Sequence, residues 1–293
     1  PFPPPDVLPI FIFPDARAEN IVITINQNWK NNGNIALISS EIPDLHFNGD
    51  AQCFPLYLYE EEAQPVSAQS DIFAQPVTTQ RTRRDAITDE GLKHFTDAYP
   101  DQGITKEDVF YYVYGLLHSP DYREQYADNL TKELPRIPRM KTAKGFWSFS
   151  TAGRALAHLH LNYETVDQYT GVTVTENGVT TSAAYRVTKM KFGKAKDKST
   201  IIYNNHITVS NIPSEAYDYV VNGRSPIEWV MDRQLVKTDK ASGIVNDAND
   251  WAIDTMNNPK YPLELLLRVI TVSLETNNIV PSLPALEIFG EAS

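Results

Sequence analysis

Cysteine is almost absent from this chain of 293 residues, which contains only Cys53. One cysteine excludes an internal disulfide framework and a zinc site built from cysteine thiolates, and it fits a cytoplasmic location. The sequence has no run of about 18 apolar residues, so it offers no candidate for a membrane-spanning helix. Residues 1–14 are rich in proline and lack a basic leader and a small-residue cleavage site, so we do not expect a secretory signal.

The sequence motifs of common enzyme active sites are missing as well. There is no glycine-rich strand-to-helix turn, no Gly-x-x-x-x-Gly-Lys phosphate loop, no Gly-x-Ser-x-Gly and no His-Glu-x-x-His. Asn258-Pro259-Lys260-Tyr261 is similar to the Asn-Pro-Pro-aromatic loop that binds a flipped adenine, but lysine replaces the second proline. We therefore expect a turn that precedes a helix there, and we assign no catalytic residue.

Positive charge is scarce overall and is concentrated in two stretches. Residues 131–154 contain six basic side chains and one acid, and residues 186–198 contain six basic side chains and Asp197. Because the whole chain has a net charge of -11, the remainder carries roughly -21. Lysine and arginine runs are usually only solvated faces, but two such stretches in an acidic chain favour a surface for a polyanion.

Two groups of possible metal ligands have simpler explanations. His158 and His160 are two residues apart on a predicted helix, so their side chains point about 200° apart and do not converge on one ion. We expect one of them to be buried and the other to be exposed or to contact the polyanion. The acids in residues 247–254 lack the glycine and the terminal glutamate of a calcium loop, and they fit a solvated helix N-terminus. No metal site is predicted.

The pattern of apolar residues predicts an α+β fold. Residues 1–85 are expected to be a small β-rich segment with a hairpin (21–25 and 35–38), a third strand (54–59) and a linker (63–84). Residues 86–293 are expected to be a larger domain of helices packed on an antiparallel sheet. Its helix starts include Thr88, a capping box of Thr105 and Asp108, and Ser150 with Thr151. The remaining expected elements are strands at 170–179, 184–192 and 200–209 and helices at 122–130, 214–221, 225–233, 246–256 and 261–275.

Several segments together carry a family resemblance. They include Leu134-Pro135-Arg136-Ile137-Pro138, Phe146-Trp147, Ala152-Gly153-Arg154, residues 159–164, 190–192, 196–201, 203–204, 207–209, 228–234 and 257–262, and upstream 39–44 and 52–57. In these segments the chain resembles the C-terminal specificity region of bacterial single-polypeptide type I-like, or type ISP, restriction-modification enzymes. Those enzymes join a helicase to an adenine-specific DNA methyltransferase.

The resemblance implies a fragment that reads double-stranded DNA by sequence, so that upstream domains can methylate adenine N6 and restrict unmodified DNA. It implies no cofactor in this fragment, because S-adenosylmethionine, ATP and magnesium would be used upstream. Basic side chains would hold phosphates, and a subset of them would reach base edges. The expected DNA-binding residues are Arg81, Arg83, Arg84, Lys132, Arg136, Arg139, Lys141, Lys144, Arg154, Lys189, Lys191 and Lys194.

Three interpretations remain open from the sequence. The chain could be the DNA-recognition module, a docking module for the upstream methyltransferase or helicase without base readout, or an enzyme with an unrecognised site. Phe146, Trp147 and Phe149 are expected to anchor their segment in the core rather than to stack on bases, because large aromatic side chains dominate core burial.

Overall fold

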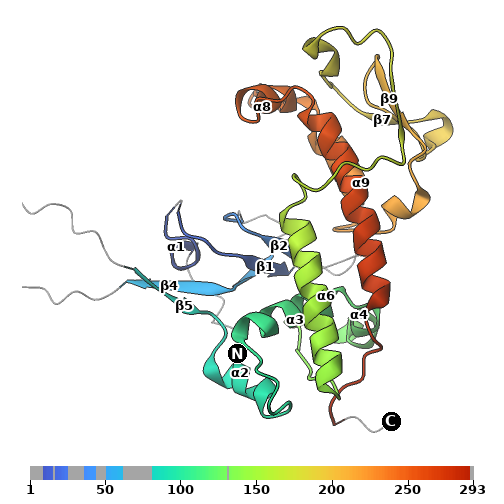
Figure 1. The fold of residues 1–293 in the computed structure, drawn as a ribbon. Helices are drawn as coiled ribbons and strands as arrows, with labels where there is room; N and C mark the ends of the chain where they lie inside the picture. Colours follow the sequence, from blue (N-terminus) through green and yellow to red (C-terminus); the bar gives the residue numbers. More distant parts are fainter. Residues whose placement is uncertain are drawn as a thin grey trace, which may run out of the picture. The chain divides into compact units, whose positions relative to one another are not determined.

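The computed structural model describes residues 9–15, 17–25, 36–43, 51–61, 81–130 and 132–290 (Figure 1). Contacts between residues divide the chain into two compact units. Of the described residues, unit 1 contains those before His158 and those from Pro284 onward, and unit 2 contains His158–Leu283. The sequence-based boundary at residue 85 lies inside unit 1 and stays a prediction. Both units combine helices with antiparallel strands, which confirms the α+β fold class.

Unit 1 begins with a short helix and a small antiparallel sheet. The elements are α1 (Pro9–Ile12), β1 (Val22–Ile25), β2 (Ala36–Ser39) and β3 (Gln52–Pro55). The central strand β1 pairs with both neighbours, and all four of its residues are buried, as expected for an apolar β-branched strand. The expected hairpin of β1 and β2 is confirmed, whereas its turn lies outside the described residues.

A second pair of strands corrects two expectations. The expected strand at 54–59 is broken at Leu56, after which β4 (Tyr57–Glu61) pairs with β5 (Arg81–Asp85). Residues 81–84 were expected to be linker, and that expectation is wrong, because their backbone completes this ladder. The pairing partner lies about 24 positions earlier in the chain, so no local pattern reveals it. The rest of the expected linker, residues 63–80, lies outside the described residues.

The other helices of unit 1 are α2 (Asp89–Thr96), α3 (Lys106–His118), α4 (Pro120–Gln125), α5 (Ala127–Leu130) and most of α6 (Ala143–Leu161). The predicted start at Thr88 and the predicted capping box of Thr105 and Asp108 are confirmed. The predicted start at Ser150 and Thr151 is wrong, because α6 begins at Ala143 and the Ser150 hydroxyl donates to the Asp108 carbonyl.

Two glycines allow α3 and α6 to cross in close contact. A Cβ atom on Gly153 would lie 1.9 Å from the Tyr111 carbonyl oxygen, and one on Gly115 would lie 2.2 Å from the Phe149 carbonyl oxygen. Phe146 and Phe149 are fully buried at this crossing, so both belong to the core as predicted. Trp147 is half-buried, and its indole N–H donates to Gln102.

Unit 2 is built on the long helix α9 (Tyr261–Ile279), whose apolar face packs into one core with a four-stranded antiparallel sheet. The sheet has the order β6-β9-β8-β7, and its strands are β6 (Thr173–Glu176), β7 (Lys191–Phe192), β8 (Ile201–Ile202) and β9 (Ile207–Ser210). The expected strand at 184–192 is wrong for most of its length: it contains the 3-10 helix η2 (Ser182–Tyr185) and irregular backbone before β7.

The remaining elements of unit 2 are short. They are η3 (Lys194–Lys196), η4 (Ser214–Tyr217), α7 (Pro226–Arg233), β10 (Val236–Thr238), β11 (Val245–Asp247), α8 (Ala248–Asp254) and η5 (Val280–Ser282). The expected helix at 214–221 is reduced to one 3-10 turn, whereas α7 begins with a capping box formed by Ser225 and Glu228. Within the described parts of the chain, no helix is long and apolar enough to span a membrane.

Candidate nucleic-acid interface

One basic surface lies in unit 1 on residues 132–142, which we call the basic arm. Apart from a single β-bridge at Met140, the arm has no helix or strand, as the prolines at 135 and 138 favour. Lys132, Arg136 and Lys141 are exposed, and Arg139 is half-buried. The structure therefore places these predicted residues together on one irregular surface segment.

The arginines in and near this arm already have partners. Arg136 lies 3.2 Å from the Glu133 carboxylate, and hydrogen bonds from Asn129 and then Arg136 hold the pKa of Glu133 below its usual value. Arg139 donates to the His94 carbonyl oxygen at 3.1 Å. Because Arg136 and Glu133 are exposed, their ion pair is weak and leaves Arg136 available to a stronger anion.

Arg154 is more deeply engaged than the arm residues. Its guanidinium contacts Glu107 at 2.7 Å and Asp108 at 3.1 Å, and it covers the Tyr111 ring at 4.1 Å. These contacts join α6 to the first turn of α3, so the local role of Arg154 is to stabilise a helix contact. Lys144, near the start of α6, is exposed, and no described carboxylate lies within ion-pair distance of it.

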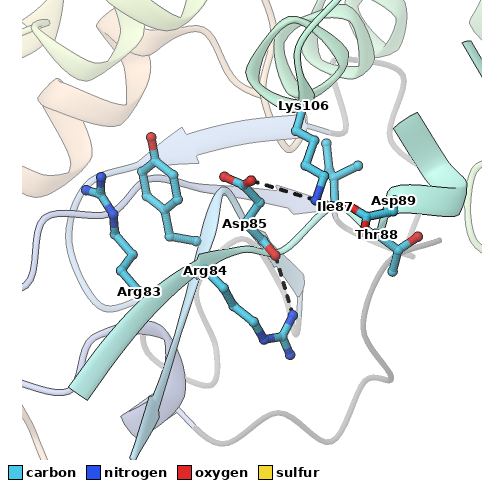
Figure 2. A pocket seen from close by; sticks show the side chains of 8 residues that line it. Arg83, Arg84, Asp85, Ile87, Thr88, Asp89 and Lys106 are labelled. Atoms are coloured by element: carbon cyan, nitrogen blue, oxygen red, sulfur yellow. Dashed lines mark hydrogen bonds and ion pairs between the residues drawn. The ribbon is translucent and has the colours of Figure 1, made fainter. Parts of the chain in front are cut away.

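Of the three predicted arginines of β5, Arg83 and Arg84 line an open cavity of about 410 Å³ (Figure 2). Arg83 covers the Tyr57 ring at 4.2 Å, Arg84 pairs with Glu60, and Arg81 donates to the Pro14 carbonyl oxygen at 3.0 Å. These residues lie on a strand and not in the linker that the sequence predicted, and their contact with DNA stays a prediction.

Lys106, which lines the same cavity, is already held in ion pairs. Lys106 contacts Asp89 at 2.6 Å and Asp85 at 3.7 Å, as Figure 2 shows in part. The ammonium group of Lys106 lowers the pKa of Asp89 through a hydrogen bond and its charge. The two carboxylates offset the charge of Lys106 and make this lysine less available to a phosphate.

The second basic surface lies in unit 2 on residues 189–198, which we call the lysine loop. Four of its lysines are exposed, and no described carboxylate lies within ion-pair distance of them: Lys189, Lys191, Lys194 and Lys196. The basic residues at the two ends of the charged stretch 186–198 have ion-pair partners instead. Arg186 pairs with Asp247, and Lys198 contacts Glu228 at 2.9 Å.

The backbone of the lysine loop is held in an unusual conformation. Ala195 and Lys196 have φ angles of 55° and 62°, in the left-handed region that L-residues rarely adopt. Asp197 closes the loop by accepting hydrogen bonds from the backbone and hydroxyl of Ser199, which lower its pKa. The Gly193 N–H donates to the carbonyls of Asp197 and Thr200. The loop is therefore preformed, with its lysines on the outside.

Lys196 is one of the basic residues of the charged stretch that the sequence-based candidates omitted. Like Lys194 it is exposed, and no described carboxylate lies within ion-pair distance of either residue. Charge density along the sequence was the signal that could have included it. Nothing in the sequence distinguished it from Lys198, which the structure shows paired with a glutamate 30 positions away.

The two histidines and the Asn258 segment have structural contacts. His158 is exposed, whereas His160 is half-buried, contacts the Thr276 hydroxyl at 2.9 Å and stacks on the Tyr219 ring. Neither histidine is fully buried, so the expectation of one buried histidine holds only in part. Asn258 starts a turn in which the Tyr261 N–H donates to its carbonyl, as predicted. The described residues contain no cluster of His, Cys, Asp or Glu suited to a metal ion.

The fold and these surfaces define an α+β module that displays one basic surface on each of two compact units. The family model of the Type ISP C-terminal specificity domain matches residues 10–265, and the chain belongs to this family. This membership confirms the resemblance found in the sequence. No curated protein matches the chain.

Solved structures of longer enzymes contain a similar module. The ATP-dependent Type ISP restriction-modification enzyme LlaBIII bound to DNA is 36% identical, with a TM-score of 0.79. A nuclease-deletion mutant of the Type ISP enzyme LlaGI in complex with a DNA substrate mimic is 39% identical, with a TM-score of 0.73. The DrdV–DNA complex is 31% identical, with a TM-score of 0.74.

The alignments with these structures cover 95% of this chain in each case, but 17%, 22% and 26% of LlaBIII, LlaGI and DrdV respectively. The chain therefore spans about a quarter or less of the length of these enzymes. What the complete enzymes bind and catalyse is a statement about them, and it motivates the proposal below for this chain.

Proposed function

We propose that this chain is a target-recognition module that binds double-stranded DNA and reads a short sequence in it. Membership of the specificity-domain family and the DNA complexes of three relatives support the proposal. The observation that carries it is the lysine loop: four exposed lysines that have no ion-pair partner among the described residues project from a preformed loop in a chain of net charge -11.

The two basic surfaces suit different parts of recognition. A lysine ammonium is a compact charge on a flexible stem, so the lysine loop suits phosphates, whose binding weakens as salt rises. A planar guanidinium suits the paired acceptors of guanine, so Arg136 and Arg139 are the candidates for base edges. In this proposal phosphate contacts fix the orientation of the module and the arginines supply part of the sequence specificity.

The proposal extends to the longer polypeptide that would contain this module. There, DNA bound by this module would be positioned for adenine-N6 methylation and for restriction by other domains, in the cytoplasm. S-adenosylmethionine, ATP and magnesium would act in those domains and not in this chain. The family membership and the small share of each relative that the chain spans support this part.

The test is the binding of this chain to a randomised duplex library at two salt concentrations, followed by sequencing of the retained DNA. We expect one short motif to be enriched, with weaker retention at the higher salt. Lys191→Ala should lower retention of all sequences, whereas Arg136→Ala should relax the motif at one position. Retention without any enriched motif would contradict sequence recognition by the chain.

A docking module is the second candidate, and an apolar surface favours it. Ile244, Val245, Trp251 and Ile253 are 52–60% exposed and lie within ten consecutive residues of unit 2. Large exposed side chains grouped in this way are typical of protein interaction sites. Failure to retain DNA at low salt, together with tight binding to the methyltransferase part of the parent enzyme that Trp251→Ala weakens, would favour docking over DNA recognition.

A further inference from the structure

Three buried tyrosines hold one edge of the basic arm. The hydroxyl of Tyr122 donates to the Arg136 carbonyl oxygen at 2.7 Å, and that of Tyr112 donates to the Pro138 carbonyl oxygen at 2.6 Å. The hydroxyl of Tyr99 donates to the carbonyl oxygen of Met140. We call Tyr99, Tyr112 and Tyr122 the tyrosine ladder. The three acceptors are two residues apart, which is the repeat of an extended chain.

The three residues of the tyrosine ladder lie on separate elements, and their rings are packed rigidly in the core. Tyr112 belongs to α3, Tyr122 belongs to α4, and Tyr99 follows α2. Tyr112 and Tyr122 are fully buried, and Tyr99 is 4% exposed. The Tyr112 ring stacks on Phe146, with ring centroids 4.9 Å apart. Packed rings leave the hydroxyl groups little freedom, so the positions of the three carbonyl groups are fixed by the core.

The opposite edge of the arm is held by the chain near its C-terminal end. The Lys141 N–H donates to the Glu287 carbonyl oxygen at 2.7 Å, and the Phe289 N–H donates to the Arg139 carbonyl oxygen at 2.8 Å. The Arg139 guanidinium covers the Phe289 ring at 4.7 Å. Odd-numbered and even-numbered backbone groups of the arm therefore face different partners, and its register is fixed from both sides.

Core packing alone does not require these hydroxyl groups. A phenylalanine ring would fill nearly the same volume, and the carbonyl oxygens of Arg136 and Pro138, which are not in buried residues, can accept from water instead. Burial raises the pKa of Tyr99 to about 12 and also raises the pKa values of Tyr112 and Tyr122. The hydroxyls therefore remain hydrogen-bond donors throughout the pH range in which proteins are folded.

We propose that the tyrosine ladder consists of positioning residues that hold the basic arm in the register in which Arg136 and its neighbours contact DNA. This inference rests on the proposed function. A free arm would have to become ordered on binding, and that loss of chain entropy would oppose association. The ladder removes this cost because the arm is ordered before DNA arrives.

The first experiment compares the full chain with Tyr122→Phe and with Tyr112→Phe combined with Tyr122→Phe. Hydrogen exchange at the backbone amides of Lys141 and Phe289, which both donate at the other edge of the arm, reports the order of the arm, and DNA affinity is measured over a series of salt concentrations. We expect faster exchange and about tenfold weaker binding for the double variant. The salt dependence should keep its slope, since no charge is removed.

The second experiment asks whether the ladder acts through the arm. In a double-mutant cycle, Tyr122→Phe should weaken binding in the wild-type chain and have little further effect when Arg136 is already alanine. The matched control is Tyr203→Phe, because Tyr203 is also fully buried and its hydroxyl donates to the Tyr185 carbonyl oxygen at 2.7 Å in unit 2. Tyr203→Phe should leave arm exchange unchanged and show no coupling to Arg136.

Unchanged exchange and affinity in the folded double variant would overturn the inference. The inference is also overturned if Tyr122→Phe weakens binding by the same factor whether residue 136 is arginine or alanine. That result would show a general loss of stability. If Arg136→Ala itself leaves binding unchanged while lysine-loop variants weaken it, the ladder proposal fails and DNA recognition stands. If the wild-type chain binds no DNA at low salt, the proposed function fails and takes the inference with it.

Discussion

The basic arm and the lysine loop have similar charge in the sequence but use it differently in the structure. Arg136 and Arg139 of the arm contact a carboxylate or a carbonyl oxygen, and nearby Arg154 contacts two carboxylates. The lysine loop instead exposes four lysines without ion-pair partners among the described residues. A count of basic residues therefore does not reveal which charges stabilise the fold and which are available to a ligand.

The largest expected effect comes from removing the available charges. Replacing Lys189, Lys191, Lys194 and Lys196 together by alanine should weaken DNA binding about a thousandfold near 0.15 M salt and lower the salt slope by about four. Fluorescence anisotropy over a salt series measures both quantities. Lys93→Ala is the control, because Lys93 is already paired with Asp97, and it should leave the slope unchanged. An unchanged slope in the quadruple variant would show that the lysine loop does not contact phosphates.

The second largest expected effect is a loss of stability of unit 1 at acid pH. His118 is fully buried at the end of α3 in unit 1, and burial lowers its pKa to about 4 from 6.5. Below pH 6.5 the unfolded chain binds a proton that the folded chain does not, so acid favours unfolding. The stability of unit 1 should fall by about 3 kcal/mol from pH 6.5 to pH 4 through this group, with full stability above pH 6.5.

Chemical denaturation followed separately in the two units measures this effect. His118→Leu should remove this pH dependence, although it also loses the contact with the Tyr114 carbonyl oxygen. His206→Gln, an exposed position in unit 2, should leave it in place. If the His118→Leu variant loses as much stability in acid as the wild-type chain, other groups cause the pH dependence.

A smaller effect should show that a basic residue can be structural. Arg154→Ala should lower the free energy of unfolding by about 1 kcal/mol, because the ion pairs of a half-exposed guanidinium and a cation–π contact are each worth little. DNA affinity and its salt slope should stay near those of the wild-type chain. Urea denaturation and the same anisotropy series test the two parts. A salt slope lower by about one would instead show that Arg154 contacts a phosphate. The basic residues of unit 1 and those of the lysine loop would then differ less than proposed here.

Local patterns in the sequence were sufficient for much of the framework. The capping box of Thr105 and Asp108, the hairpin of β1 and β2 and the long apolar helix at α9 follow from neighbouring residues, and the structure contains each of them. The start of α6 could not be placed in the same way. Gly145 near its start indicates a loop, but burial of Phe146 and Phe149 against α3 extends the helix back to Ala143.

The site was harder to predict because its chemistry depends on distant partners. The strands expected at 184–192 and 200–209 left only residues 193–199 of the lysine loop outside a strand, and the structure has no strand there. The sequence could not show that Arg154 meets Glu107 across 47 positions, or that Arg186 meets Asp247 across 61. It also gave no sign of the tyrosine ladder, because a tyrosine that only packs and one that also donates to the backbone of the arm have the same sequence signature.

The smallest expected effect concerns the backbone of the lysine loop. Ala195 has a φ of 55°, where a Cβ atom costs about 1 kcal/mol and glycine avoids that cost. Ala195→Gly should therefore stabilise the folded chain by about 0.5 kcal/mol, less than the full strain because glycine also gives the unfolded chain more freedom. DNA binding should weaken about twofold to threefold with an unchanged salt slope, since the same lysines would project from a less rigid loop. Thermal denaturation and anisotropy measure the two changes. If Ala195→Gly lowers stability and leaves binding unchanged, the left-handed turn is neither strained nor needed to present the lysines. The lysine loop would then differ from the basic arm only in having unpaired charge.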